Sequence, residues 1–277
     1  MARAATSTLP ATLGLGPVHL IVRDRERSLR WYEQVLGLER TGDAELSGIV
    51  HLHEDPEAGP ASRHAGLYHY ALLLPSREEL ARALLRLSAA QAPIQGLSDH
   101  VTHEAVYLAD PDGNGIELAA DRPREQWPTV EEMYGHGPQP LDVDALLQTA
   151  AGEEPASTVE AGLRVGHLHL TVGDIAEALS FYRDLVGFEL QANLGTAIFL
   201  SAGGYHHQLG LNVWKGEGVG PAPQHTAGLR NWTIELPEAD AGDLRRRLEE
   251  AGREVEPAER GFRVHDPWEI AFDVITP

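Results

Sequence analysis

The sequence has no cysteine, a single lysine (Lys215) and two methionines among its 277 residues. Without cysteine, the chain cannot form a disulfide, a zinc–thiolate site or a thiol nucleophile. Any metal must therefore be held by histidine and carboxylate side chains. The 14 histidines and the 42 Asp and Glu residues supply both kinds of ligand in number.

Long apolar runs and positive charge are also scarce. No stretch approaches the roughly 20 apolar residues of a membrane-spanning helix, and residues 1–15 lack the apolar core of a signal peptide. Lys and Arg number 22 against 42 Asp and Glu, which gives a formal charge of −20. Nucleic acid and anionic membrane surfaces would repel such a chain. We therefore expect a soluble cytoplasmic protein with neither as a partner, and leave open whether it forms a homo-oligomer.

The chain contains an internal repeat. Residues 17–24 and 167–174 each have the alternating character of a strand and end at an aspartate that can cap a helix. Residues 28–38 and 180–188 then place apolar side chains at helical spacing around a glycine suited to end the helix. The offset between the two copies is 150 residues.

A second pair of segments follows the same plan. Residues 66–75 and 228–237 resemble each other as strands, and a helical pattern follows each of them. Each copy then ends in an Asp-Pro turn and a final strand, at residues 110–118 and 266–274. The unit of strand, helix and several strands is thus used four times, starting near residues 16, 66, 166 and 228, which predicts the α+β class.

These modules suggest domain boundaries. We expect an N-terminal half at 1–121, made of modules 16–65 and 66–121, and a C-terminal half at 164–277, made of modules 164–227 and 228–277. Residues 122–163 are rich in Pro, Gly, Glu and Ala, and we interpret them as a surface linker with a short helix near 142–152.

The second module carries a candidate metal site. His69 lies in one β-rich apolar run, and Glu117 lies in another, just after the turn Asp110-Pro111-Asp112-Gly113-Asn114. An imidazole and a carboxylate on two rigid strands are what a divalent metal site needs.

The arrangement resembles the vicinal oxygen chelate superfamily. Within it, the chain is similar to the two-domain catechol 2,3-dioxygenases, which are extradiol ring-cleavage enzymes. The likeness is sharpest at His100, Val106-Tyr107, Asp110-Pro111-Asp112-Gly113 and Glu117. Ser98 departs from the signature, which prefers other small or aliphatic residues there. The resemblance implies four βαβββ modules that form two cup-shaped mixed sheets.

The resemblance also implies roles for individual residues. His69 and Glu117 would be metal ligands, and His100 and Tyr107 would lie near the substrate's hydroxyl and the bound oxygen. We expect His100 to be the first choice for moving protons, with His207 second. His206 and His207 are adjacent, so on a strand they would face opposite sides and at most one would line the cup.

The third ligand would be a first-strand histidine of another module. His169 completes the site if modules two and three share a cup, and His19 completes it if modules one and two do. We favour His169, because the third module carries many polar groups between residues 201 and 214. In the fourth module Asn231 and Asp273 replace the histidine and the glutamate. We therefore expect one metal per chain and a second cup that is structural.

The implied function is extradiol cleavage of catechol or a substituted catechol. A non-haem Fe(II), or Mn(II), would be the cofactor, and a small aromatic diol and dioxygen would be the partners. Insertion of both oxygen atoms would give a muconic semialdehyde. The alternatives are a glyoxalase-like lyase or isomerase, a hydroquinone-cleaving dioxygenase and a non-catalytic small-molecule binding protein. The ligand set and not the fold must decide among these.

Overall fold

The computed structural model describes residues 8–60, 62–135, 137–153 and 156–277. Residues 1–7, part of the segment expected to lack a signal peptide, lie outside that description. Among the described residues, no helix is long and apolar enough to cross a membrane.

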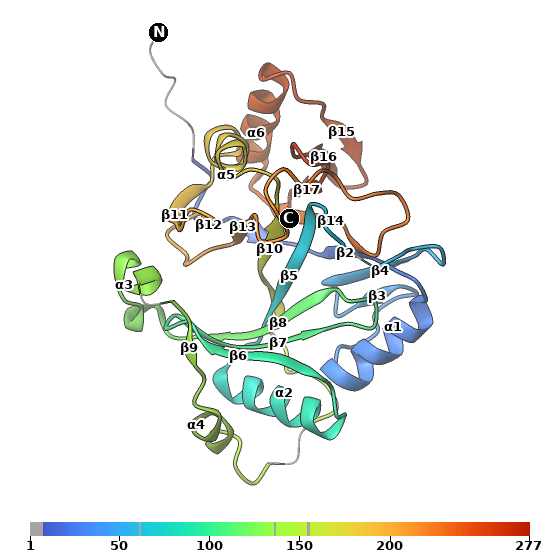
Figure 1. Cartoon of the computed structure of the whole chain (residues 1–277), viewed down its shortest axis with the longest axis vertical. Helices are drawn as coiled ribbons and strands as arrows, with labels where there is room; N and C mark the ends of the chain where they lie inside the picture. The colour runs from blue at the N-terminus through green and yellow to red at the C-terminus, as the bar shows by residue number, and fades with distance from the viewer. Residues whose placement is uncertain (1–7, 61, 136, 154–155) are drawn as a thin grey trace.

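The expected module of strand, helix and several strands occurs four times (Figure 1). Module one contains β1 Gly14–Leu15, β2 Val18–Val22, α1 Arg25–Trp31, the π-helical turn η1 Tyr32–Leu36, β3 Glu45–Leu46 and β4 Val50–Glu54. Module two contains β5 Gly66–Leu73, α2 Arg77–Ala89, β6 Ile94–Asp99, β7 His103–Ala109 and β8 Gly115–Asp121. Module three contains β10 Arg164–Thr171, α5 Ile175–Ala178, the π-helical turn η3 Leu179–Val186, β11 Glu189–Asn193, β12 Ala197–Ser201 and β13 Leu209–Asn212. Module four contains β14 Gly228–Glu235, α6 Glu238–Glu250, β15 Glu256–Ala258, β16 Gly261–His265 and β17 Ala271–Ile275.

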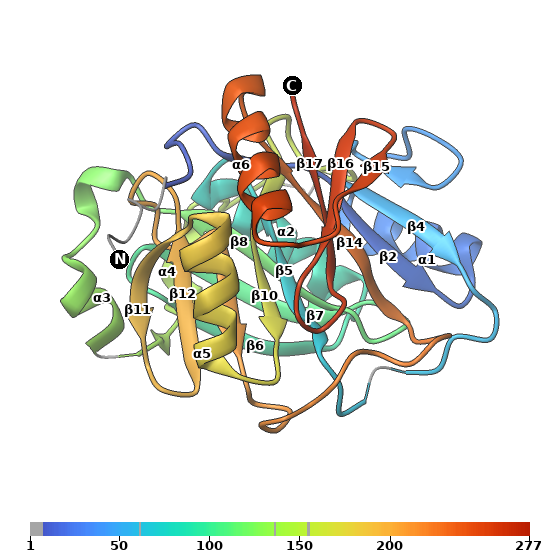
Figure 2. The ribbon, with the colours of Figure 1, turned by 90° about the horizontal axis from the view of Figure 1, so that it is seen from above.

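The modules pair across the two halves of the chain. One sheet has nine strands in the order β11-β12-β13-β10-β5-β8-β7-β6-β9, and so joins modules three and two. The other has eight strands and joins modules four and one through the antiparallel pair β14 and β2. The expected halves, 1–121 and 164–277, therefore describe chain order only, because each sheet takes one module from each half (Figures 1 and 2). The shared sheet of modules two and three is the pairing that the sequence favoured.

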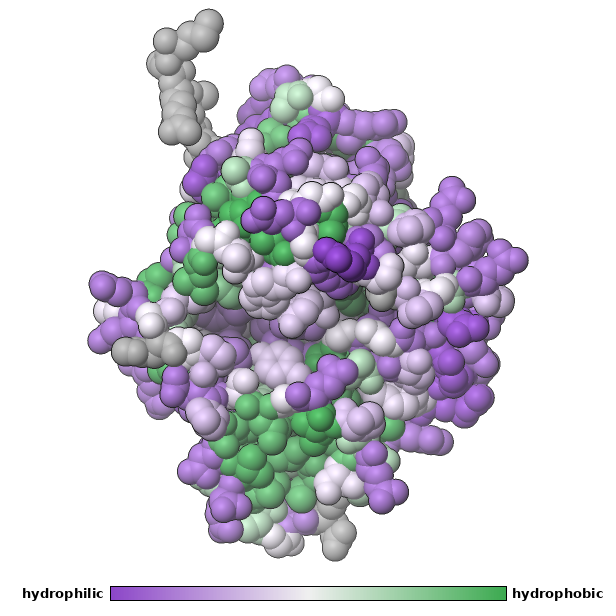
Figure 3. Space-filling view, viewed as in Figure 1, coloured by the Kyte–Doolittle hydropathy of each residue, from purple (hydrophilic) through white to green (hydrophobic). Residues whose placement is uncertain are grey.

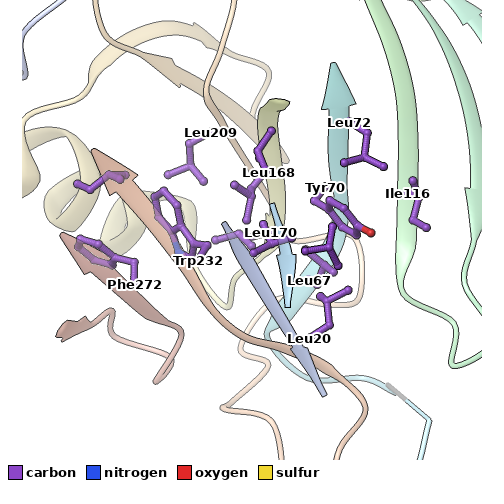
Figure 4. Close-up of a cluster of buried hydrophobic side chains, with 14 of the residues drawn as sticks. Leu20, Leu67, Tyr70, Leu72, Ile116, Leu168, Leu170, Leu209, Trp232 and Phe272 are labelled. Atoms are coloured by element: carbon purple, nitrogen blue, oxygen red, sulfur yellow. The ribbon is translucent and has the colours of Figure 1, made fainter. Parts of the chain in front are cut away.

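The central strands divide their side chains between a common core and a cup. Leu168 and Leu170 of β10 and Tyr70 and Leu72 of β5 are buried in the core, together with Trp232 of β14 from the other sheet (Figure 4). Since side chains alternate along a strand, the residues between them face the opposite side. That side carries the histidines of both strands, and it forms the cup.

Both Asp-Pro turns are held in the same way. Asp110 Oδ1 accepts hydrogen bonds from two backbone N–H groups of its turn, and its Oδ2 accepts one from Tyr32 Oη at 3.0 Å. Asp266 makes the same contacts in module four, with Tyr182 Oη as the donor at 2.8 Å. Each buried carboxylate thus fixes the start of the last strand of its module and ties it to the helix of the neighbouring module.

The segment expected to be a linker has structure of its own. It contains η2 Arg124–Gln126, α3 Val130–Gly135, β9 Gln139–Pro140 and α4 Val143–Gln148. β9 extends the nine-stranded sheet by pairing with β6. Tyr134 Oη of α3 donates a hydrogen bond of 2.7 Å to the carbonyl of His206. The segment therefore closes one side of the cup.

Candidate metal centre

Strand register places the candidate ligands in two rows across the cup. His167 of β10 lies opposite Ala71 of β5, which lies beside Glu117 of β8, which in turn lies opposite Tyr107 of β7. His169 and His69 face each other in the next row. The methyl group of Ala71 leaves room for His167 and Glu117 to meet across β5.

Three imidazoles surround Glu117, whose exposure is 1%. Its Oε2 lies 3.0 Å from His167 Nε2 and 3.1 Å from His69 Nε2. Its Oε1 lies 3.2 Å from His103 Nε2. His69, Glu117 and His167 each offer a ligand atom within 4.8 Å of the others, the spread expected of groups that could hold one metal ion.

The electrostatics suit a divalent cation. Burial raises the pKa of the Glu117 carboxyl, but His167, His103 and His69 around it hold that pKa well below its ordinary value. Burial lowers the pKa of His167 even though Glu117 opposes the shift. An ionised carboxylate beside neutral imidazoles is the state in which these side chains bind metal. The donor set therefore fits a metal ion that takes two nitrogens and one carboxylate oxygen.

The two histidines expected as third ligand lie elsewhere. His169 lies opposite His69, one row away from Glu117, and is not in the group formed by His69, Glu117 and His167. Its Nε2 is buried without a hydrogen-bond partner among the described residues. His19 lies on β2 in the other sheet, where its Nδ1 is 3.0 Å from His53 Nε2. The geometry favours His167 over both.

The spacing to the helix cap places His167, and not His169, at the position equivalent to His69. His69 stands seven residues before Ser76, whose side chain caps α2. His167 likewise stands seven residues before Asp174, which caps α5. His169 is two residues too close to that cap. Because strand and cap fix the same local geometry in both modules, equal spacing predicts equal positions on the two strands.

His100 and Tyr107 lie together in the cup. The Nε2 of His100 is 2.8 Å from Tyr107 Oη, and the His100 ring stacks on His103 at 4.6 Å between centroids. Burial, with His103 beside it, lowers the pKa of His100 to about 4. Burial next to Glu117 raises the pKa of the Tyr107 phenol. At neutral pH, the pair is thus an uncharged imidazole and an un-ionised phenol.

His206 and His207 contradict the alternation expected of a strand. They lie in the loop between β12 and β13, and both line the cup. The two Nδ1 atoms are 2.9 Å apart, and the ring of His207 lies 4.3 Å from that of His167. His206 Nε2 is 3.3 Å from Asp121 Oδ1, at the end of β8. The sequence analysis missed Asp121 and His103, since neither falls in a recognisable pattern.

The cup is a cavity of about 570 Å³. Its inner end is formed by the histidines and Glu117, and its outer wall includes Met133 and Tyr134 of α3, Phe199 and Trp214. The molecular surface is hollowed beside α3 (Figure 3). A cavity of this size falls in the range of about 300–1,000 Å³ that is usual for small-molecule sites.

Among the described residues the second sheet has no equivalent centre. The candidate groups of three metal-binding side chains all lie on the nine-stranded sheet and the loops that join its strands, and they are His69-Glu117-His167, His100-His103-Glu117 and His103-Asp121-His206. At the matching positions, Asn231 Nδ2 donates to Asp273 Oδ2 at 3.0 Å. Arg263 donates two hydrogen bonds to the same carboxylate, at 2.7 and 2.9 Å. An arginine thus neutralises the carboxylate that a metal would need.

Paired βαβββ modules with a histidine and glutamate cluster in the cup of one sheet define the class of protein. The family model described as the Glyoxalase/Bleomycin resistance protein/Dioxygenase superfamily matches residues 14–118 and 164–270. The chain belongs to this superfamily. It is 42% identical over 273 residues, with 93% of this chain and 95% of the relative covered, to a Bacillus subtilis (strain 168) protein named "Catechol-2,3-dioxygenase". The predicted likeness to catechol 2,3-dioxygenases is confirmed.

Solved structures support the fold alone. Glyoxalase I from Zea mays matches with a TM-score of 0.54 and 16% identity, over 95% of this chain and 93% of that one. The cppA protein from Streptococcus pneumoniae TIGR4 matches with a TM-score of 0.55 and 13% identity, over 95% of this chain and all of that one (100%).

Proposed function

We propose that the protein is an extradiol dioxygenase that cleaves catechol or a substituted catechol, with His69, His167 and Glu117 as the metal ligands. The observation that carries the proposal is the convergence of two imidazoles on one buried carboxylate at the inner end of a cavity. The relative named a catechol-2,3-dioxygenase supports the reaction class. His167 here replaces His169, the ligand expected from the sequence.

The metal would be Fe(II), with Mn(II) as the alternative, because two imidazoles and one carboxylate on one face suit both. Bound there, it would bring a chelated diol and dioxygen together and carry electrons between them. The protein's part would be to hold the metal with His69, His167 and Glu117 where the cavity gives a substrate access to it. The imidazole of His103, whose Nε2 lies 3.2 Å from Glu117 Oε1, would help to orient the carboxylate.

His100, Tyr107 and His207 would act on the substrate. A neutral His100 can accept a proton from a catechol hydroxyl and return it later, because burial keeps the imidazole uncharged at neutral pH. Tyr107 can donate its hydroxyl to a substrate oxygen. His207 is buried beside His167 and is the second candidate for moving a proton. The product would be a muconic semialdehyde.

Anaerobic reconstitution with ferrous iron tests the proposal directly. Catechol and then air are added, and absorbance in the semialdehyde band and oxygen uptake are followed together. A yellow product formed with one equivalent of oxygen supports extradiol cleavage. Manganese-loaded protein tested in parallel decides which metal supports turnover.

Absence of both product and oxygen uptake over catechol, methylcatechols and hydroquinone would reject the proposal in favour of a glyoxalase-like lyase or isomerase, or a binding protein. Cleavage of hydroquinone alone would keep ring opening but change the substrate. No observation in the cavity favours either outcome over catechol cleavage. The expected cytoplasmic location stays a prediction.

A further inference from the structure

The outer part of the cavity is much larger than the metal centre needs. The cavity has a volume of about 570 Å³, whereas the candidate ligands and the His100–Tyr107 pair lie only at its inner end. Cavities of about 300–1,000 Å³ usually accommodate drug-sized ligands. A catechol ring chelated at the inner end would therefore leave the outer part to be filled by a substituent.

The outer wall is aromatic. Tyr68 and Trp214 meet edge to face at 5.2 Å, and each also contacts the ring of His169, at 5.2 and 5.1 Å. Phe199 continues the wall from His169 to Tyr134 of α3, with centroid distances of 5.8 and 4.8 Å. Aromatic faces and edges at these spacings pack well against a planar or branched apolar group.

Exposed apolar side chains surround the mouth. Leu194, Trp214 and Tyr68 remain 53%, 51% and 42% exposed, and all three line the cavity. Large apolar side chains gathered at a cavity and left in water indicate a binding surface.

Among the described residues that line the cavity, none is arginine or lysine. The arginines nearby have other partners. Arg122 donates to both oxygens of Asp99, at 2.7 and 2.8 Å, and Arg124 donates to the carbonyl of Gly203 at 2.8 Å. Lys215, although next to Trp214, donates to the carbonyl of Leu67.

A substituent in the outer part of the cavity therefore meets no arginine or lysine side chain among the described residues. A carboxylate on the substrate would lose its water here without gaining a positive partner, which is costly.

We infer that the preferred substrate is a catechol with a bulky, uncharged, apolar substituent, of aryl or branched alkyl type, held against the wall of Tyr68, Phe199, Trp214 and His169. The inference rests on the proposed ring cleavage and adds a charge and size requirement to it. His169, expected from the sequence to bind metal, becomes part of the wall that contacts the substituent.

A matched series of substrates tests both requirements. Catechol, 3-phenylcatechol and 4-phenylcatechol compare size, while 3,4-dihydroxyphenylacetate and its methyl ester compare charge at nearly constant shape. With iron-loaded protein, the better phenylcatechol should exceed catechol in kcat/KM by about tenfold, and the ester should exceed the acid by roughly 100-fold.

A charge placed at the mouth should change this selectivity. Leu194→Arg should lower the ester-to-acid ratio about tenfold, by giving the acid a partner. Leu190→Arg is the control, because Leu190 is also an exposed leucine on the same hairpin, at 37%, but does not line the cavity. The control should leave the ratio unchanged.

Affinity measured without oxygen separates this inference from the proposed function. Quenching of tryptophan fluorescence under nitrogen gives dissociation constants for the same compounds, whether or not turnover occurs. If catechol is cleaved but the acid equals or exceeds its ester, the inference is overturned and the proposed function stands. If nothing is cleaved but the ester and the phenylcatechols bind more tightly than the acid and catechol, the proposed function fails and the cavity assignment stands. Equal binding without cleavage overturns both.

Discussion

The two sheets are built alike but differ in the residues at their centres. Each joins two modules through an antiparallel pair of first strands, and each fixes its last strand with a buried aspartate that accepts a hydrogen bond from a tyrosine. By strand register, Asn231 stands in the second sheet where His69 stands in the first. Asp273 likewise stands where Glu117 does. The register also matches Tyr107 with Arg263, since each lies opposite the carboxylate of its sheet.

This difference separates the requirements of the fold from those of the chemistry. In the second sheet Arg263 and Asn231 satisfy Asp273 with hydrogen bonds, and the carboxylate then serves only to hold strands together. In the first sheet the carboxylate meets imidazole nitrogens that could bind a cation with it. A repeated scaffold thus carries a candidate metal site in one copy and an ion pair in the other.

Substitution of the two matched carboxylates should give the largest contrast. Glu117→Gln should lower iron affinity by more than about 100-fold, because loss of groups that merely support metal ligands already costs roughly 10–100-fold. Asp273→Asn should leave iron content and ring cleavage intact. It should lower the free energy of unfolding by about 1–2 kcal/mol, because Arg263 loses a charged partner. Metal analysis and urea denaturation of both variants check this, and equal iron loss in the two would remove the distinction between the sheets.

Iron binding should be nearly as sensitive to a larger side chain at Ala71, which lies on the strand between His167 and Glu117. Ala71→Val places extra methyl groups between His167 and Glu117, at a residue with no exposed surface. We expect a stability cost of about 1–3 kcal/mol and clear loss of bound iron. Thr233→Val, at the corresponding position beside Asp273, should keep its iron. Iron content and thermal unfolding of the two variants are the measurements, and full iron content in Ala71→Val would show that His167 and Glu117 do not share an ion across β5.

The sequence alone indicates the four modules and several of the candidate site residues. The four modules, His69, Glu117 and the His100–Tyr107 pair lie on strands and turns whose patterns are local, and the structure brings them together. His167 could not be separated from His169 by alternation, because both point to the same side of β10. Irregular pairing on both sides of these residues, between Val165 and His167 and between His169 and Leu170, sets which of them meets Glu117.

Other parts of the site depend on tertiary structure. Residues 122–163 are interpreted from the sequence as a linker because they are rich in Pro, Gly, Glu and Ala, yet α3 packs over the cavity through the Tyr134 hydroxyl. The strand rule was wrong for His206 and His207 because the sequence gives no sign that β12 ends at Ser201. Contacts that close a cup between modules far apart in the chain leave no local pattern.

The hydrogen bond from a tyrosine to the buried aspartate should stabilise the Asp-Pro turn in both sheets. Tyr32→Phe and Tyr182→Phe each remove a donor to a buried aspartate, and each should cost about 1–3 kcal/mol of unfolding free energy. Tyr32→Phe should be the more damaging, since Tyr32 Oη also accepts a hydrogen bond from Tyr70. Urea denaturation measures both. A cost confined to one sheet would contradict the view that the turns share one structural role.

The smallest predicted effect is on the pH dependence of the unfolding free energy, through two histidines of the second sheet. Burial lowers the pKa of His19 and of His53 to about 4, from an ordinary value of 6.5. The unfolded chain therefore takes up protons first, so that their contribution to stability is present above pH 6.5 and is lost as the pH falls toward 4. The double variant His19→Gln/His53→Gln should show a shallower fall in unfolding free energy over this interval than the parent protein. An unchanged slope would exclude these two groups as its source.

Iron binding by His167→Ala and His169→Ala tests the central claim most directly. Both histidines are buried on the same strand, so the two variants are matched in chemistry and place. After anaerobic reconstitution and removal of free metal, the account predicts that His167→Ala retains almost no iron, whereas His169→Ala retains close to one iron per chain. Retention by His167→Ala together with loss in His169→Ala would contradict it, and would restore the ligand expected from the sequence.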